Sequence, residues 1–312
     1  MSVDARPLRV GTRGSALARA QASSVAAALA GHGRKAELVE ITTAGDRSTA
    51  AIAQLGGTGV FVSALRDALL AGTIDVAVHS YKDLPTAAAD GLLLAAVPPR
   101  EDPRDALAAR DGLTLAELPH HATVGTGSPR RIAALLALGL GLRPVGVRGN
   151  VDTRLGKVAS GELDAVVLAR AGLARLDRLD AVTEMLDPLQ MLPAPAQGAL
   201  AVECRADAEV ALIDLLATLD EPDSRAAVAA ERALLAALEA GCTAPVGALA
   251  EVALGDDNEP ELFLRGSVTA ADGSDAIRLS ATGPLDSPEA IGRRLAADLL
   301  ADGASKLLGS PR

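Results

Sequence analysis

The segment from Asp75 to Thr86 constrains the fold more than any other part of the chain. Its start, Asp75–His79, is short and largely apolar, which is typical of a strand inside a parallel sheet with both faces covered. Pro85 cannot join a ladder, so the strand ends before it. Open parallel sheets bind ligands outside the carboxyl ends of their strands. The segment therefore predicts either a ligand site or a solvated Lys–Asp pair at this end, which consists of Ser80, Lys82 and Asp83.

Basic side chains also follow most of the other predicted strands. The first strand ends in Arg13, and Ser15 is expected to cap the helix that follows. A phosphate site usually concentrates its donors in one Gly-rich loop, whereas these donors are spread over several strand ends. Arg binds a carboxylate through two parallel hydrogen bonds. The pattern therefore favours a ligand with several separated carboxylates, bound by Arg13, Lys82, Arg130, Arg131, Arg148, Arg154 and Arg175.

Two adjacent arginines lie where a helix is expected to begin. Ser128 is a good N-cap and Pro129 is a favoured first helical residue, so Arg130 and Arg131 fall in the first turn. Helix N-termini disfavour cations by roughly 0.3–1 kcal/mol. Either both side chains extend into solvent, or an anion lies between them and the backbone N–H groups. We favour the anion.

Composition narrows the class of protein. A chain of 312 residues can form two or three domains, and its net charge of -10 argues against general nucleic-acid or membrane-surface binding. No apolar run is long enough to span a bilayer, and residues 1–10 lack the apolar core of a signal peptide. The two cysteines lack metal-ligand spacing. We expect a cytoplasmic monomer with no metal, nucleic-acid or membrane partner.

The two cysteines have different surroundings. Cys204 lies in an apolar strand predicted at 199–204 and is expected to be a buried small hydrophobe. A long Ala-rich helix is expected to follow Asp223 or Ser224, which would cap it. Cys242 comes after this helix, on a loop beside Gly241. A thiol there is exposed and reactive, which fits a functional cysteine or a chance one. Three strand-like runs near 246–253, 261–270 and 276–282 then predict a small α+β domain, with a hairpin turn at Asp272-Gly273.

Six stretches in order along nearly the whole chain resemble one family, porphobilinogen deaminase (hydroxymethylbilane synthase). They are Gly11–Ser15, Val78–Pro85, Gly125–Arg131, Val147–Leu155, Gln197–Glu203, and Ala230-Glu-Arg through Gly241-Cys242. The resemblance implies an α/β fold with two periplasmic-binding-protein-like lobes and a small α+β third domain. It implies domain 1 at 1–98 plus 199–218, domain 2 at 104–192 and domain 3 at 221–312, so the strand at 199–204 returns to the first lobe.

The resemblance also implies the activity and the residues that serve it. The family joins four porphobilinogen units head to tail, releases ammonia, and carries a covalent dipyrromethane cofactor on a thioether. Here the attachment residue would be Cys242 and the catalytic carboxylate Asp83. The cofactor would be held by Ser80, Lys82, Asp83, Thr126, Ser128, Arg130 and Arg131. Substrate would be bound by Arg13, Ser15, Phe61, Arg148, Arg154, Arg175 and Gln197.

Elementary chemistry supports the role of Asp83 independently. The substrate loses its aminomethyl nitrogen as ammonia and becomes a cationic azafulvene. A carboxylate in a partly dehydrated site stabilises such a cation, accepts hydrogen bonds from pyrrole N–H groups and moves protons. Each added pyrrole brings two more carboxylates, which the arginines would neutralise.

The sequence departs from the family pattern at two positions, and it leaves two other functions possible. Thr58 replaces a family lysine in the 43–59 connection, a candidate lid, which puts a gating role for that position in doubt. Ala196 stands where the family more often has Gly, with little consequence expected, and Phe61 either covers a pyrrole or anchors a helix. A solute-binding module of the same architecture would need neither Cys242 nor the third domain. An enzyme acting on a different carboxylated metabolite is a further alternative.

Overall fold

The computed structural model describes residues 6–41, 59–240, 244–255 and 258–308. Thr58 and Cys242, on which two predictions rest, lie outside these residues, and so does the side chain of Phe61. The chain forms two compact units, Met1–Arg100 with Ala199–Arg225, and Glu101–Gly198 with Ala226–Arg312.

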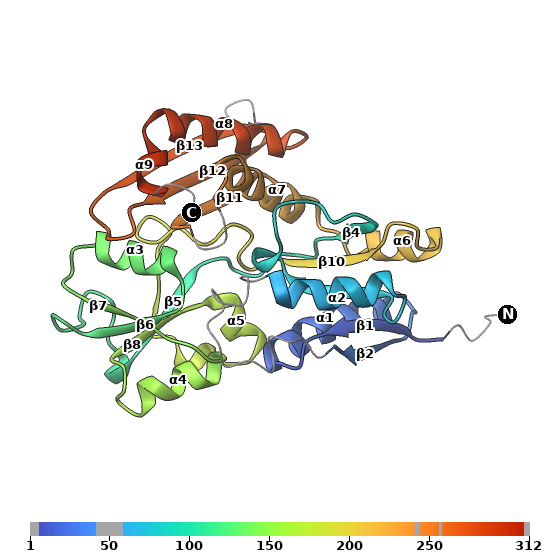
Figure 1. The fold of residues 1–312 in the computed structure, drawn as a ribbon, viewed down its shortest axis with the longest axis horizontal. Helices are drawn as coiled ribbons and strands as arrows, with labels where there is room; N and C mark the ends of the chain where they lie inside the picture. Colours follow the sequence, from blue (N-terminus) through green and yellow to red (C-terminus); the bar gives the residue numbers. More distant parts are fainter. Residues whose placement is uncertain (1–5, 42–58, 241–243, 256–257, 309–312) are drawn as a thin grey trace. The chain divides into compact units, whose positions relative to one another are not determined.

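The first unit contains a five-stranded sheet (Figure 1). Its strand order is β2-β1-β3-β10-β4. Strand β1 is parallel to β2 and β3, whereas β10 runs antiparallel between β3 and β4. The strand predicted after residue 75 is therefore present, but its sheet is mixed rather than parallel. The bounds are β1 Leu8–Thr12, β2 Ala36–Glu40, β3 Val76–Ser80, β4 Leu92–Ala96 and β10 Leu200–Arg205.

Helices cover both faces of this sheet, as the apolar sequence of β3 predicts. Helix α1, Ala16–Gly31, begins where expected, because the Ser15 hydroxyl accepts the N–H of Ala18 at 3.2 Å. Its Val25 packs with Val76 and Val78, and helix α6, Val210–Ala217, joins the same core. Helix α2, Gly59–Leu70, packs against Ala77, which points to the opposite face.

The second unit begins with a sheet of the same plan. Its order is β7-β6-β8-β5-β9, and the fourth strand again runs antiparallel to the third. Parallel β6, β7 and β8 bring their carboxyl ends to one edge. The bounds are β5 Asp105–Ala109, β6 Thr123–Thr126, α3 Pro129–Ala137, β7 Arg143–Gly146, α4 Val151–Ala159, β8 Ala165–Ala169, α5 Arg170–Arg175 and β9 Glu184–Met185.

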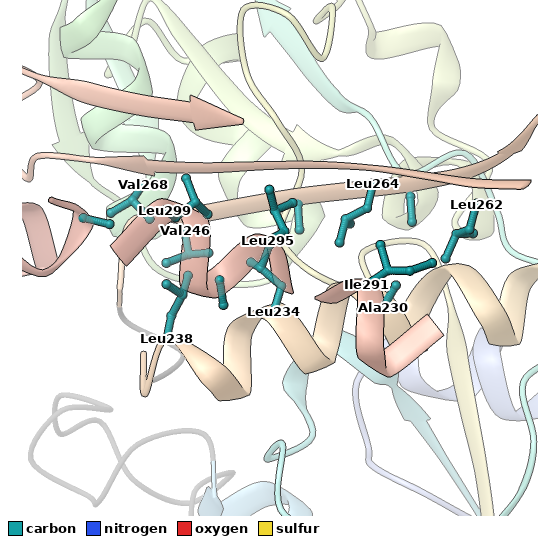
Figure 2. Close-up of a cluster of buried hydrophobic side chains, with 14 of the residues drawn as sticks. Ala230, Leu234, Leu238, Val246, Leu262, Leu264, Val268, Ile291, Leu295 and Leu299 are labelled. Atoms are coloured by element: carbon teal, nitrogen blue, oxygen red, sulfur yellow. The ribbon is translucent and has the colours of Figure 1, made fainter. Parts of the chain in front are cut away.

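The C-terminal part is the small α+β domain that the sequence predicts. Strands β11, β12 and β13 form an antiparallel sheet, and α7, α8 and α9 supply its apolar partners. Figure 2 shows the core, in which Leu234 and Leu295 lie beneath Leu264 of the sheet. The bounds are α7 Pro222–Ala237, β11 Val246–Leu254, β12 Pro260–Thr269, β13 Ala276–Pro284, α8 Pro288–Ala301 and α9 Ala304–Leu308.

Two local predictions need correction. Ser128 stands at the N-cap of α3, but its side chain makes no capping hydrogen bond. Helix α7 begins one or two residues earlier than the cap we expected, and the Glu221 carboxylate accepts the N–H groups of Asp223 and Ser224. The α/β class with a small third domain is confirmed. None of the helices in the described part of the chain has the length and apolar character needed to cross a membrane.

Candidate active site

In the first unit, the predicted site residues lie at one edge of the sheet. Strands β1 and β3 are parallel neighbours, with Gly11 opposite Ala77, so their carboxyl ends meet at the same edge. Arg13 follows β1, and a short 3-10 helix, Tyr81–Asp83, follows β3. The topology therefore places Arg13 and Ser15 on the same side of the sheet as Lys82 and Asp83.

The turn that carries Asp83 is firmly held. The Ser80 hydroxyl accepts a hydrogen bond from Nε2 of the buried Gln21 at 2.8 Å. Buried Tyr81 donates its N–H to the carbonyl of Ala199 at 3.0 Å. Asp83 itself is exposed, and within the described residues its carboxylate has no hydrogen-bond or ion-pair partner. A rigid support with an exposed carboxylate suits a group that acts on a ligand.

Arg66, His79 and Glu203 form a buried charged cluster that includes a residue of β3. The Arg66 guanidinium donates to both oxygens of Glu203, with Nε–Oε2 at 3.0 Å and Nη2–Oε1 at 2.7 Å. Nε2 of His79 lies 3.2 Å from Oε2 of the same carboxylate. Burial alone would raise the pKa of Glu203, but His79 and Arg66 more than offset this and lower it to about 2. The cluster therefore joins α2, β3 and β10 next to the Asp83 turn.

In the second unit, the adjacent arginines at the start of α3 are both buried around one carboxylate. Asp105, the first residue of β5, is fully buried. Its Oδ2 accepts Nη2 of Arg130 at 2.7 Å, and its Oδ1 accepts Nη2 of Arg131 at 2.7 Å and Nε of Arg131 at 3.1 Å. The alternative in which both side chains extend into solvent is therefore wrong, and the anion that they contact is a protein carboxylate that sequence reasoning missed. A bound ligand anion stays a prediction. The signal for the carboxylate was the unfavourable position of two cations in a first helical turn.

Gln197 completes this group. Its Nε2 donates to Oδ1 of Asp105 at 2.8 Å and to the carbonyl of Pro103 at 2.7 Å. Burial would raise the pKa of Asp105, but the charges and hydrogen bonds of Arg130 and Arg131 hold it well below its usual range. The structure thus brings together three of the predicted site residues around a carboxylate whose pKa is lowered.

The other predicted site residues of this unit lie at the end of β6 or follow β7 and β8 along the chain. Nε of Arg154 donates to the carbonyl of Gly149 at 2.9 Å, and burial together with the charge of Arg131 lowers the pKa of Arg154. Nη2 of Arg175 donates to the carbonyl of Gly198 at 2.6 Å, and burial lowers its pKa as well. Arg148 is exposed after β7. Thr126 accepts the N–H of Ser128 at 3.3 Å.

The charges in this group leave it cationic. Arg130, Arg131 and Asp105 together carry a net charge of about +1, because arginine stays protonated in proteins. Nε of Arg130 is buried and has no hydrogen-bond partner among the described residues. The Arg130 and Arg131 N–H groups also lie in the first turn of α3. This arrangement fits the binding of a carboxylate. The described residues contain no group of three His, Cys, Asp or Glu side chains placed to hold a metal.

Comparison with known proteins decides which family this geometry serves. Residues 8–212 match the model of "Porphobilinogen deaminase, dipyromethane cofactor binding domain". Residues 225–301 match the model of "Porphobilinogen deaminase, C-terminal domain". The chain belongs to the porphobilinogen deaminase family.

Relatives of this family match along nearly the whole chain. The porphobilinogen deaminase of Nocardia farcinica is 61% identical over 306 residues, 97% of this chain and 88% of the relative. That of Mycobacterium bovis is 61% identical over 309 residues, 98% of this chain and 99% of the relative. Among solved structures, an ABC transporter periplasmic substrate-binding protein from Coxiella burnetii covers 72% of this chain and 96% of its own. Its TM-score is 0.42 and its sequence identity is 13%.

Proposed function

We propose that this chain is the transferase that joins four porphobilinogen units into the linear tetrapyrrole hydroxymethylbilane, with release of ammonia, in porphyrin and haem biosynthesis. The observation that carries the proposal is the match of both porphobilinogen deaminase models, over residues 8–212 and 225–301. We further propose that it works in the cytoplasm as a monomer. Sedimentation or size-exclusion measurements test the last point.

The cofactor of this family is a dipyrromethane, and the described residues fit its acidic groups. Arg130 and Arg131 would bind acetate or propionate through donors that Asp105 leaves unused, such as the buried Nε of Arg130. Ser80, Lys82, Thr126 and Ser128 would supply further hydrogen bonds. When bound, the dipyrromethane provides the pyrrole to which substrate is added, and Cys242 would carry it on a thioether.

Asp83 would act on the substrate itself. Its carboxylate is exposed and unpaired among the described residues, so it can face the positive charge that develops as ammonia leaves. It can also accept a pyrrole N–H and take up the proton released when a new carbon–carbon bond forms. The carboxylates of incoming substrate would be bound by Arg13, Ser15, Arg148, Arg154, Arg175 and Gln197, with Phe61 alongside the pyrrole.

Turnover provides the first test. Purified protein incubated with porphobilinogen should release ammonia and an uncyclised tetrapyrrole. Asp83→Asn should retain bound pyrroles and lose turnover by about a hundredfold or more, because general acid–base catalysis contributes roughly 10²–10⁴-fold. Asp90→Asn, an exposed aspartate in the same unit, is the matched control and should turn over normally. Unchanged turnover in Asp83→Asn would refute the assignment.

Intact mass provides a second test that needs no activity. The chain has two cysteines, so two variants separate the candidates. Cys204→Ala should keep a mass increment of about two pyrrole units, because Cys204 is fully buried in β10. Cys242→Ala should lose the increment. A solute-binding module would show no increment in either variant or in the parent protein.

A further inference from the structure

Three arginines proposed to bind carboxylates are tied to one short segment, residues 192–198. The segment lies between β9 and β10 and belongs to the second unit. Each arginine donates to a different group of it. The pairs are Arg130 Nη1 with the Leu192 carbonyl, Arg131 Nη2 with Gln197 Oε1 at 3.4 Å, and Arg175 Nη2 with the Gly198 carbonyl at 2.6 Å. The position of this segment therefore sets where three guanidinium groups lie.

The backbone of the segment adopts a conformation that needs support. Ala196 has a φ of 61°, in the left-handed region that a residue with a β-carbon disfavours. It is fully buried. Gly198 has a φ of 90°, and a β-carbon there would lie 2.2 Å from the carbonyl oxygen of Glu101. Such conformations persist only where surrounding contacts fix them.

The contact that fixes Ala196 comes from the C-terminal domain. Glu231, on α7, is fully buried, and its carboxylate accepts the N–H of Ala196 at 2.6 Å and the N–H of Ala250 on β11 at 2.8 Å. The N–H of Ala248 donates to the carbonyl of Pro193 at 2.9 Å. A buried carboxylate is tolerated because hydrogen bonds of this kind replace its water. Helix α7 and strand β11 thus hold the 192–198 segment at two points.

We propose that Glu231 is a positioning residue for substrate binding. By holding Ala196 in its left-handed conformation, it keeps Gln197 against Asp105 and Arg131 and keeps the Gly198 carbonyl against Arg175. Glu231 lies in the Ala230-Glu-Arg stretch, to which the proposed function assigns no task. The inference rests on the proposed function, and it gives the C-terminal domain a part in substrate binding beyond carrying the cofactor.

The central test is Glu231→Gln in the full chain with its attached cofactor. The amide keeps one acceptor oxygen, but its NH₂ group then faces the second backbone N–H, so the 192–198 segment should shift. We expect kcat/KM for porphobilinogen to fall about 10- to 100-fold, mainly through KM, because small displacements of positioning groups have effects of this size. Glu289→Gln, an exposed residue of α8, is the matched control and should behave like the parent protein.

Two double variants separate positioning from a general loss of stability. If Glu231 acts partly through Gln197, adding Glu231→Gln to Gln197→Ala should lower kcat/KM by clearly less than Glu231→Gln lowers it in the parent protein. Adding Ala196→Gly to Glu231→Gln should recover activity, because glycine adopts the left-handed conformation without the β-carbon penalty. Effects that simply multiply, or no recovery with Ala196→Gly, would overturn the proposal. If Glu231→Gln does not fold, Glu231→Asp is measured with the same expectations.

Hydrogen exchange keeps this test independent of turnover. Peptides that contain residues 192–198 should exchange amide hydrogens at least about tenfold faster in Glu231→Gln than in the parent protein or in Glu289→Gln. Unchanged exchange would overturn the positioning role even in a fully active enzyme. If exchange is faster in Glu231→Gln but the parent protein turns over no porphobilinogen, Glu231 remains the anchor of the segment and the proposed function is rejected instead.

Discussion

Replacement of Asp105 by Asn removes the charge that Arg130 and Arg131 share. The carboxylate accepts four hydrogen bonds, three from these arginines and one from Gln197. Both arginine side chains are only 7% exposed, so neither can turn to water when its partner is lost. Their other described partners include the carbonyls of Leu192 and Val167, which supply no negative charge.

The expected loss of stability follows from this burial. Breaking a buried ion pair from one side costs about 3–5 kcal/mol, because it leaves an uncompensated charge. Here two like charges remain together, which places Asp105→Asn at the upper part of that range. With a urea m-value of about 3 kcal/mol per molar, the unfolding midpoint should fall by about 1 M or more. The chain has no Trp and one Tyr, so far-ultraviolet circular dichroism is the suitable signal.

The pH dependence and a matched variant complete the measurement. The pKa of Asp105 is depressed in the folded state, so its stabilisation is present above the ordinary Asp pKa of about 3.9 and is lost as the pH falls below that value. The gap between parent and variant should be constant from about pH 5 to 8 and close in acid. Asp298→Asn, exposed on α8, should change stability by less than about 0.5 kcal/mol. An Asp105→Asn midpoint within about 0.3 M of the parent at neutral pH refutes the reasoning.

Three further predictions concern other parts of the chain. Gly198→Ala should lower the free energy of unfolding by more than about 2 kcal/mol, because Gly198 has a φ of 90° and the added β-carbon would lie 2.2 Å from the Glu101 carbonyl oxygen. Gly31→Ala is the control: its added β-carbon meets nothing within 4 Å, so it should be neutral in the same urea titration. The pKa of Glu203 is lowered from 4.5 to about 2, so the stability that its charge contributes should be lost as the pH falls through this range. Between about pH 4.5 and 2, the Tm of the parent protein should therefore fall more steeply than the Tm of Glu203→Gln. Parallel plots of Tm against pH would contradict this. Burial raises the pKa of Cys204 and Cys242 would carry the cofactor, so a thiol reagent should label no cysteine in the native protein and one after unfolding.

Local signals in the sequence predicted much of the fold. The cap at Ser15 is present, because it depends only on the next few residues. The turn at Asp272-Gly273 also forms as expected, with Asp272 accepting the N–H of Ser274 at 3.0 Å. Strand ends that carry site residues were visible because a buried apolar run followed by polar residues is a short-range pattern.

Features that depend on distant partners were not visible. Strand β5 is Ala-rich and shows no alternation of apolar and polar residues. Its pairing partner β8 begins 60 residues further along the chain, with Asp105 opposite Ala169 and Ala109 opposite Ala165. Asp105 meets arginines that are 25 and 26 residues away, a distance at which no spacing rule applies. The return of β10 to the first sheet came from the family resemblance, since periodicity gives no strand order. Ala196, expected to matter little, has a backbone conformation that favours the family's glycine.

The insertion of β10 between β3 and β4 has a consequence for biosynthesis. A ribosome releases β4, which ends at Ala96, long before β10, which begins at Leu200. Until then β3 and β4 each expose an unpaired edge, and such edges attract strands of other nascent chains. The first sheet can therefore be completed only after residues 101–198, which interrupt the first unit, have been synthesised. A chaperone would protect the chain during this interval, before β10 pairs with β3 and β4.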